Sequence, residues 1–190
     1  MSDRVLVFLG SPRKRANSTL LAGQIAAGAQ AAGAEVETFT LHEMDIRPCR
    51  ACEGCHRPNS HGCVIDDDMQ ALYPKLRAAD AIVIASPVYW FTVSAQTKLL
   101  MDRWYALEGP QGNALRGKRF AIALTYGDSD PFTSGAVNAL RTFQDACRFI
   151  GAEIVGMVYG TASQEGEIAA NQALLERAYR LGQQLVKPAS

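Results

Sequence analysis

The sequence lacks an excess of charge of either sign. Nineteen Lys and Arg residues balance 19 Asp and Glu residues in a chain of 190 residues, so the formal net charge is zero. A nucleic-acid-binding protein is expected to carry a basic excess or a basic face, and a charged tail would unbalance the total. We therefore expect no nucleic-acid partner.

Long hydrophobic runs are also missing. No apolar stretch reaches the roughly 20 residues that a membrane-spanning helix needs, and the apolar run at residues 5–9 is too short for a signal peptide. These absences predict a cytoplasmic protein with no membrane contact. Because thiols stay reduced in that compartment, we interpret the five cysteines as metal ligands, redox groups or core residues before disulfides.

Short apolar runs alternate with helical patterns along the chain. The runs predict strands at 4–9, 35–41, 80–85, 119–125 and 153–159, and the helical patterns lie at 18–32, 66–79, 92–107, 133–150 and 163–186. This alternation is typical of a three-layer α/β domain with a five-stranded parallel sheet, and right-handed crossovers favour the order 2-1-3-4-5. At about 150 residues per domain, residues 1–190 form one domain. Ligands are then expected at the carboxyl ends of the first and third strands.

The loop after the first strand, GSPRKRANST, contains the parts of a phosphate site. It offers hydroxyl, amide and basic side chains just before a helix begins, and the N-terminus of a helix attracts anions. The Gly-Lys-Ser/Thr of a Walker loop and the glycines of a dinucleotide fingerprint are absent, which leaves one terminal phosphate monoester. The alternative is an ordinary capped helix after a solvated basic loop.

The segment after the third strand carries three consecutive aromatic residues, Tyr89, Trp90 and Phe91, behind Pro87 and Val88. Three adjacent aromatic side chains in a loop cannot all be core, so at least one is expected to face a flat, partly apolar ligand. A protein interface rich in aromatic residues is the competing interpretation. Residues 125–130, TYGDSD, leave the fourth strand on the same side.

These segments resemble a known family. GSPRKRANS, SPVYWFTVSAQTKLLMDR and the later GDSD-type loop are similar to motifs of the flavodoxin-like NADPH-dependent FMN reductases, over residues 4–160. The resemblance implies an oxidoreductase in which FMN does the redox chemistry, with NAD(P)H as electron donor and a small acceptor such as a quinone or free flavin. It implies that the phosphate is held by Ser11, Arg13, Asn17, Ser18 and Thr19. The ring would then lie against residues 87–91 and its pyrimidine edge near Tyr126, Gly127 and Asp128, with no side chain acting as acid, base or nucleophile.

Four of the five cysteines fall inside a long insertion at residues 42–65. Cys49, Cys52, Cys55 and Cys63 follow the spacing C-x2-C-x2-C-x7-C, and the C-x2-C-x2-C part lets successive thiolates face one cluster, as in bacterial ferredoxins. The motif resembles that of the iron-sulfur flavoproteins of the same family, which implies a 4Fe-4S cluster that exchanges electrons with FMN. Structural zinc held with His56 or His61, and thiols without any metal, remain alternatives. Cys147 lies on the apolar stripe of its helix and is expected in the core.

Three functions follow from these patterns. The first is an FMN-dependent NAD(P)H oxidoreductase, the second an iron-sulfur flavoprotein that shuttles electrons between a ferredoxin-type donor and an acceptor, and the third a metal-binding interaction module on a flavodoxin scaffold. The aromatic residues beside the ligand site and the position of the insertion favour a homodimer or homotetramer in which the insertion of one subunit reaches the flavin of another. The family's dimers and tetramers agree with that expectation.

Overall fold

The computed structural model describes residues 2–186. The strands are β1 (Arg4–Leu9), β2 (Glu35–Thr40), β3 (Ala81–Tyr89), β4 (Thr92–Val93), β5 (Glu108–Gly109), β6 (Gly112–Asn113), β7 (Arg119–Tyr126) and β8 (Glu153–Thr161). The α-helices are α1 (Asn17–Ala31), α2 (Met69–Ala78), α3 (Ala95–Asp102), α4 (Ala136–Ile150) and α5 (Gln172–Leu185), and the 3-10 turns are η1 (Leu41–Glu43), η2 (Gly54–His56), η3 (Arg103–Leu107) and η4 (Glu167–Ala170).

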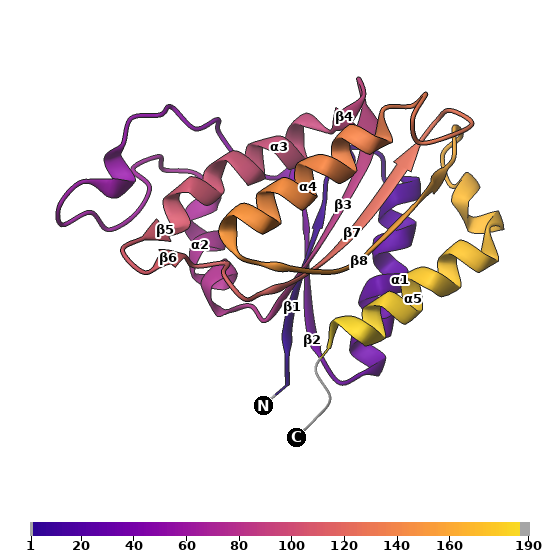
Figure 1. Ribbon diagram of the computed structural model, residues 1–190, viewed down its shortest axis with the longest axis horizontal. Helices are drawn as coiled ribbons and strands as arrows, with labels where there is room; N and C mark the ends of the chain where they lie inside the picture. Colours follow the sequence, from indigo (N-terminus) through magenta and orange to yellow (C-terminus); the bar gives the residue numbers. More distant parts are fainter. Residues whose placement is uncertain (1, 187–190) are drawn as a thin grey trace.

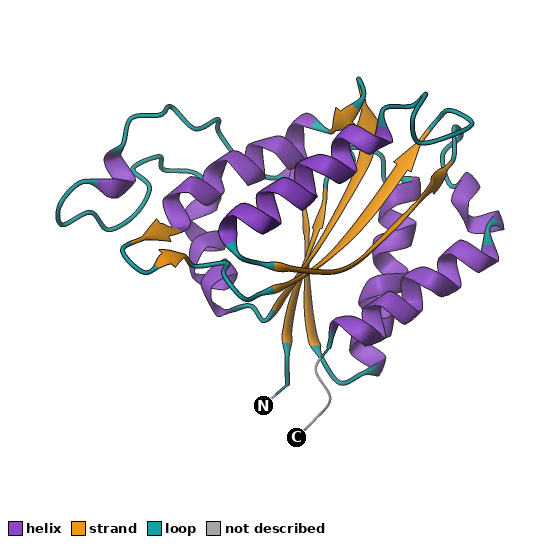
Figure 2. Ribbon diagram, in the orientation of Figure 1, coloured by secondary structure: helices purple, strands orange, loops and turns teal. Residues whose placement is uncertain are grey.

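The main sheet has the order β2-β1-β3-β7-β8 with all five strands parallel. This is the predicted order 2-1-3-4-5, because β7 and β8 are the fourth and fifth long strands along the chain. Figures 1 and 2 show the twisted sheet in the middle, with helices on both of its faces. The three-layer α/β architecture expected from the sequence is therefore confirmed, and its switch point lies between β1 and β3.

The two faces of the sheet are built from different side chains. Large residues such as Phe8, Ile84 and Phe120 pack against α2, α3 and α4, whereas small ones such as Ala85 and Ala121 pack against α1 and α5. Residues that alternate along one strand point to opposite faces, so each strand supplies both cores. The small residues let α1 and α5 approach the sheet closely.

The helices α1 and α5 cross at two glycines. A methyl group on Gly28 would lie 1.9 Å from the carbonyl oxygen of Tyr179, and one on Gly182 would lie 1.9 Å from the carbonyl oxygen of Ile25. No side chain fits between the two backbones at this crossing. The helix that follows the loop after β1 is therefore held directly by the backbone of α5.

Residues 87–91 are more ordered than the predicted loop. The strand β3 continues to Tyr89, pairs with β7 as far as Pro87, and forms a hairpin with β4 through Val88 and Val93. Proline is tolerated there because the pairing with β1 ends at Ala85, so its missing N–H costs no hydrogen bond to β1. The expectation of a plain loop after Ala85 is wrong.

Several helices start later than predicted. The helix expected at 92–107 is preceded by β4, starts after the Ser94 cap, and ends as the 3-10 turn η3. The helix expected at 133–150 starts after Gly135, whose φ is 73°, and the one expected at 163–186 is divided by Asn171 into η4 and α5. Glycine at positive φ and side-chain caps set these starts, rather than the apolar pattern. Within residues 2–186, no helix has the length and apolar character that crossing a bilayer requires.

Candidate functional site

Two adjoining hollows lie at the carboxyl ends of β1, β3 and β7. One has a volume of about 230 Å³ and the other about 260 Å³, and both are lined by Val88, Tyr126 and Gly127. We call the two together the switch-point cleft. Its lining includes every predicted FMN-binding residue except Ser18 and Thr19, namely Ser11, Arg13, Asn17, Pro87, Val88, Tyr89, Trp90, Phe91, Tyr126, Gly127 and Asp128.

The first hollow lies beside an uncapped helix end. The residue before α1, Ala16, supplies no side-chain cap, and no acidic residue lies in the first turn. Ser18 is 1% exposed, and its hydroxyl has no hydrogen-bond partner among residues 2–186. Buried helix ends normally have partners for their first N–H groups. This end is therefore suited to an anion, with the exposed Arg13 in the same lining.

The side-chain amide of Asn17 is hydrogen-bonded to other residues of the protein. Its amide nitrogen donates to the carbonyl oxygen of Gln164 at 2.7 Å, and its amide oxygen accepts from the N–H of Ile168 at 3.0 Å. Both bonds tie the start of α1 to the segment after β8. Both ends of the side-chain amide are thus occupied, so the predicted contact of Asn17 with a phosphate is left to its backbone N–H.

A buried hydroxyl network supports the floor of the cleft. Ser94 donates from its hydroxyl to the carbonyl oxygen of Gly10 at 2.7 Å, and its N–H donates to the hydroxyl of Ser86 at 2.9 Å. A methyl group on Gly10 would lie 2.0 Å from Oγ1 of Thr97. The loop after β1, the end of β3 and the start of α3 are thus fixed to one another.

The second hollow is bordered by the segment after β7. The hydroxyl of Ser163 donates to the carbonyl oxygen of Gly127 at 2.8 Å, and Thr161 donates to that of Asp128. Burial raises the pKa of Tyr126, and the neighbouring Tyr159 adds to the shift. The phenol therefore stays neutral near pH 7, and the backbone of 127–128 is held by β8 and the residues after it.

The hairpin turn between β3 and β4 is strained. Trp90 and Phe91 have φ values of 47° and 67°, the left-handed region that a two-residue hairpin turn requires and that Asn-Gly usually supplies. A residue other than glycine in such a conformation costs about 1–3 kcal/mol, and such residues cluster at functional sites. Trp90 is 92% exposed, so burial of its ring does not explain the strain. We call these two residues the aromatic turn.

The insertion at 42–65, which we call the cysteine loop, is fastened at its base. The N–H of Asp45 donates to the carboxylate of Asp68 at 2.8 Å, and the N–H of Arg47 donates to that of Asp67 at 3.0 Å. The sequence predicts Asp66 or Asp67 as the cap of the following helix, but the residue before α2 is Asp68, whose side chain forms no capping hydrogen bond. The neighbouring Asp67 accepts from the N–H of Met69 at 3.1 Å. The aspartates therefore close the loop as well as starting α2.

A buried arginine contacts one of the cysteines. Arg103 forms an ion pair with Asp67, with side-chain exposures of 1% and 0%, and it donates to Sγ of Cys63 at 3.3 Å. Burial opposes ionisation of this thiol, but hydrogen bonds from the Ile65 backbone, Tyr73 and Arg103 outweigh it and lower the pKa of Cys63. Cys63 therefore ionises more readily than an ordinary cysteine to the thiolate, the form that binds metals.

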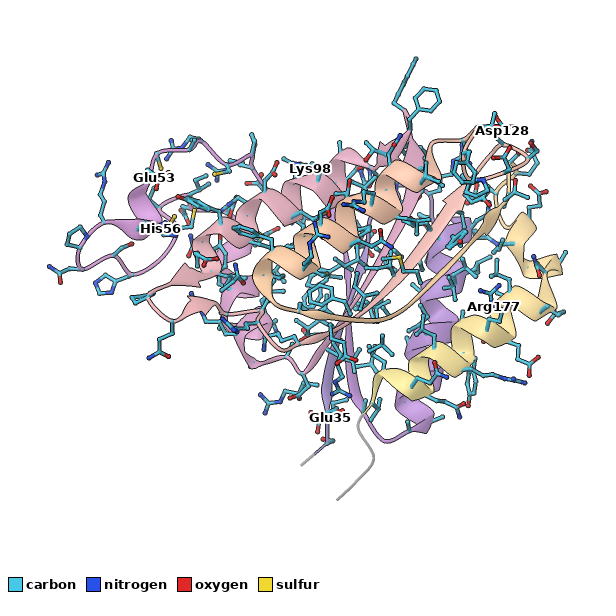
Figure 3. The ribbon with its side chains drawn as sticks, viewed as in Figure 1. Glu35, Glu53, His56, Lys98, Asp128 and Arg177 are labelled. Carbon is cyan, nitrogen blue, oxygen red and sulfur yellow. The ribbon has the colours of Figure 1, made fainter. Side chains whose placement is uncertain are left out.

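The four cysteines of the loop are free thiols. Among residues 2–186, no three His, Cys, Asp or Glu side chains are arranged to hold a metal ion, so the ligand set suits a cluster in its chemistry but is not assembled around a common point. His56 contacts the carbonyl oxygen of Tyr105 through Nε2 at 3.0 Å, and its ring packs 4.4 Å from that of Tyr105. Figure 3 shows Glu53 and His56 of the cysteine loop at the opposite end of the molecule from Asp128.

Cys147 lies in the core, as predicted. It is 1% exposed, on the face of α4 that packs against the sheet, and burial raises its pKa to about 12. The thiol therefore stays protonated and unreactive at neutral pH.

Sequence reasoning missed three groups of residues around these sites. Arg103 and the network formed by Ser86, Ser94 and Thr97 were not singled out, and neither was the segment 161–164 that borders the cleft. Two signals were available in the sequence. One is the presence of small polar residues inside an apolar strand and at a helix start, and the other is the GTAS run at the carboxyl end of the fifth strand. Nothing near Arg103 in the sequence indicates its partners, which lie 36 and 40 positions away.

Residues 4–164 match the family described as NADPH-dependent FMN reductase. The chain is 37% identical over 153 residues to an iron-sulfur flavoprotein of Methanosarcina thermophila, covering 77% of this chain and 74% of that protein. It is 24% identical over 189 residues to a Bacillus subtilis protein described as an NAD(P)H-dependent FMN-containing oxidoreductase, covering 94% and 96%. The structure of an NAD(P)H:quinone oxidoreductase from Methanothermobacter marburgensis has a TM-score of 0.73 at 20% identity, covering 97% of this chain and 100% of that one, and shares the fold.

Proposed function

The chain belongs to the family of NADPH-dependent FMN reductases, and on that premise we propose that the switch-point cleft binds FMN. The protein would take electrons from NAD(P)H and pass them to a small acceptor such as a quinone or free flavin. Bound FMN supplies the hydride and electron chemistry, and the residues of this chain bind and orient it.

The uncapped start of α1 carries this proposal. The free N–H groups of a helix start, the positive end of its dipole and the unpartnered Ser18 hydroxyl together fit a phosphate with its negative charge and acceptor oxygens. Arg13 adds a guanidinium that binds two phosphate oxygens at once.

The remaining lining fits a flat ring with one polar edge. Residues 87–89 offer an extended backbone and the aromatic turn offers aromatic side chains, and the backbone of Tyr126, Gly127 and Asp128 borders the other side. Ser163 and Thr161 bond to the carbonyl oxygens of that backbone, and we propose that its N–H groups donate to the carbonyl oxygens of a pyrimidine edge. A ligand seated there would run from the start of α1 to the aromatic turn.

The test is FMN binding followed by turnover. Purified apoprotein is titrated into FMN and the quenching of flavin fluorescence is followed, and NADPH oxidation is then measured with and without a quinone. We expect saturable binding and quinone-dependent NADPH oxidation. A colourless protein that leaves flavin fluorescence unchanged would refute the proposal and favour an interaction module on this scaffold.

For the cysteine loop, we propose that Cys49, Cys52, Cys55 and Cys63 bind a 4Fe-4S cluster, which makes electron transfer with a redox protein the second candidate function. The hydrogen bond from Arg103 to Cys63 supports this proposal, since it stabilises one ligand as thiolate. Ala51 and Glu53, at φ values of 49° and 55°, also bend the backbone sharply on either side of Cys52.

The second candidate function is tested by measuring the iron and acid-labile sulfide content of protein prepared without oxygen. About four of each per chain, and their loss in Cys52→Ser, are the expected results. A matched Cys147→Ser variant should keep the full content because that thiol lies in the core. Stoichiometric zinc, or no metal at all, would refute the cluster.

The positions of the two sites favour assembly of several copies. The cysteine loop and the switch-point cleft lie at opposite ends of one chain (Figure 3), so we propose a homodimer or homotetramer in which the loop of one subunit approaches the cleft of another. Sedimentation with and without FMN measures the oligomeric state. The five free thiols fit a reducing compartment, and we propose the cytoplasm.

A further inference from the structure

The aromatic turn is held from outside its hairpin. The amide nitrogen of Asn138, on the first turn of α4, donates to the carbonyl oxygen of Phe91 at 3.1 Å. Just before that helix, Gly135 lies so close that a methyl group on it would be 2.5 Å from Cβ of Phe91. The hairpin itself contributes only the pairs Val88–Val93 and Tyr89–Thr92. Two residues in left-handed conformations are thus kept in place largely by α4.

The turn and the start of α4 face the same hollow. Trp90 and Phe91 line it from one side, and Thr133 and Ser134 line it from the other. Trp90 contacts Phe91 edge to face, with ring centroids 6.5 Å apart. Any change in the position of Phe91 therefore moves both aromatic rings relative to this end of the cleft.

We propose that Asn138 is a positioning residue, which fixes the aromatic turn as one wall of the binding site for a planar, partly apolar acceptor. Asn138 does not line the hollow, so it acts through Phe91 and not by contact with the acceptor. This role rests on the proposed function, because it needs FMN bound in the switch-point cleft and an acceptor that stacks beside it at the aromatic turn.

The geometry explains why a hydrogen bond is used here. Trp90 and Phe91 are poor residues for a turn that requires positive φ at both positions, so without an external contact the turn relaxes to other conformations. Aromatic side chains in this wall provide a stacking surface for a flat acceptor. A smaller charged acceptor gains little binding energy from the same surface. Loss of the bond is therefore expected to act selectively on planar acceptors.

The experiment compares Asn138→Asp with Gln144→Glu. Both replace an exposed amide on α4 by a carboxylate, and the side chain of Gln144 has no hydrogen-bond partner among the described residues. For Asn138→Asp we expect the KM for 2-methyl-1,4-naphthoquinone to rise about fivefold, the factor that one neutral hydrogen bond represents. The KM for ferricyanide should not change. Because residues 87–91 are also proposed to contact FMN, the affinity for FMN is measured in parallel and should change by a smaller factor than the KM for the quinone. Gln144→Glu should behave as the wild type does.

A second readout follows the turn itself and needs no cofactor. In a Trp104→Phe background Trp90 is the remaining tryptophan, and its time-resolved anisotropy should show more fast motion after Asn138→Asp. With Phe91→Gly added, the strain at that position is removed, and Asn138→Asp should then have no effect on the anisotropy. A merely structural role of Asn138 would produce the same effect in both backgrounds.

Unchanged anisotropy, or equal changes of KM for the quinone and for ferricyanide, would overturn the positioning role while leaving FMN binding intact. Failure of the wild-type chain to bind FMN would overturn the proposed function and this role with it. The two failures are distinguishable because only the second is visible in the unmodified protein.

Discussion

Replacement of Asp67 by asparagine tests whether the buried ion pair holds the cysteine loop to the domain. The Asp67 carboxylate accepts from Arg103, from the N–H of Arg47 at 3.0 Å and from that of Met69 at 3.1 Å. Asparagine keeps the shape but loses the charge, so the guanidinium of Arg103 stays buried without a counterion. Removing one partner of such a pair costs about 3–5 kcal/mol.

The loss of stability in Asp67→Asn can be measured by urea unfolding under reducing conditions at pH 7. We expect the free energy of unfolding to fall by about 3–5 kcal/mol, and the midpoint of thermal unfolding by about 6–20 °C at 2–4 °C per kcal/mol. The matched control is Asp145→Asn, which breaks an exposed ion pair with Arg141 and should change stability very little. Equal effects of the two substitutions would refute the reasoning.

The pH dependence of the same variant provides an independent check. Burial alone would raise the pKa of Asp67, but the hydrogen bonds from Arg103 and from two backbone N–H groups lower it below its ordinary value. A depressed folded pKa gives stability that is present above the unfolded pKa of about 3.9 and is lost as the pH falls through the folded value. As the pH is lowered from 5 until the protein unfolds, the free energy of unfolding should therefore fall more for the wild type than for Asp67→Asn.

Three further predictions concern the cleft and the core. Arg13→Ala should weaken FMN binding more than Lys14→Ala, measured by flavin fluorescence, because only Arg13 lines the cleft; equal losses would contradict the assignment. Gly10→Ala should weaken FMN binding by tenfold or more, about 1.4 kcal/mol or above, since the added methyl group would lie 2.0 Å from Oγ1 of Thr97; unchanged affinity would show that the loop shifts freely. Cys147, with a pKa of about 12, should resist iodoacetamide at pH 8 in the folded protein and react after unfolding, as mass spectrometry would reveal; labelling without unfolding would refute its burial.

Periodic patterns predicted the strands and helices because those depend on local residue types. The rule of right-handed crossovers then predicted the sheet order and the position of the cleft. A buried strand such as residues 119–125 is visible as an apolar run, and the parallel arrangement follows from its alternation with helices. The boundaries were harder to predict, since glycine at positive φ and side-chain caps decide them. Gly135 and Ser94 are examples, and both start their helices later than the apolar pattern suggests.

Contacts between distant residues could not be predicted from the sequence. Arg103 was read as one more position in a helix, whereas it is buried beside Asp67 and Cys63. The sequence predicted a loop at residues 87–91. The contact that supports the aromatic turn comes from Asn138, 47 positions after Phe91. The phosphate role of Asn17 was inferred from its residue type, which does not reveal that its amide already has partners.

The bonds of Asn17 also set an order of events during biosynthesis. Its amide reaches Ile168, 151 positions later in the chain. At roughly 5–20 residues per second, the ribosome needs roughly 8–30 s to make that partner after Asn17 itself. The loop after β1 thus spends the whole of this interval without the contacts that fasten it to the segment after β8. Loading of a nucleotide-like molecule is accordingly expected to follow completion of the nascent chain, not to guide its early folding.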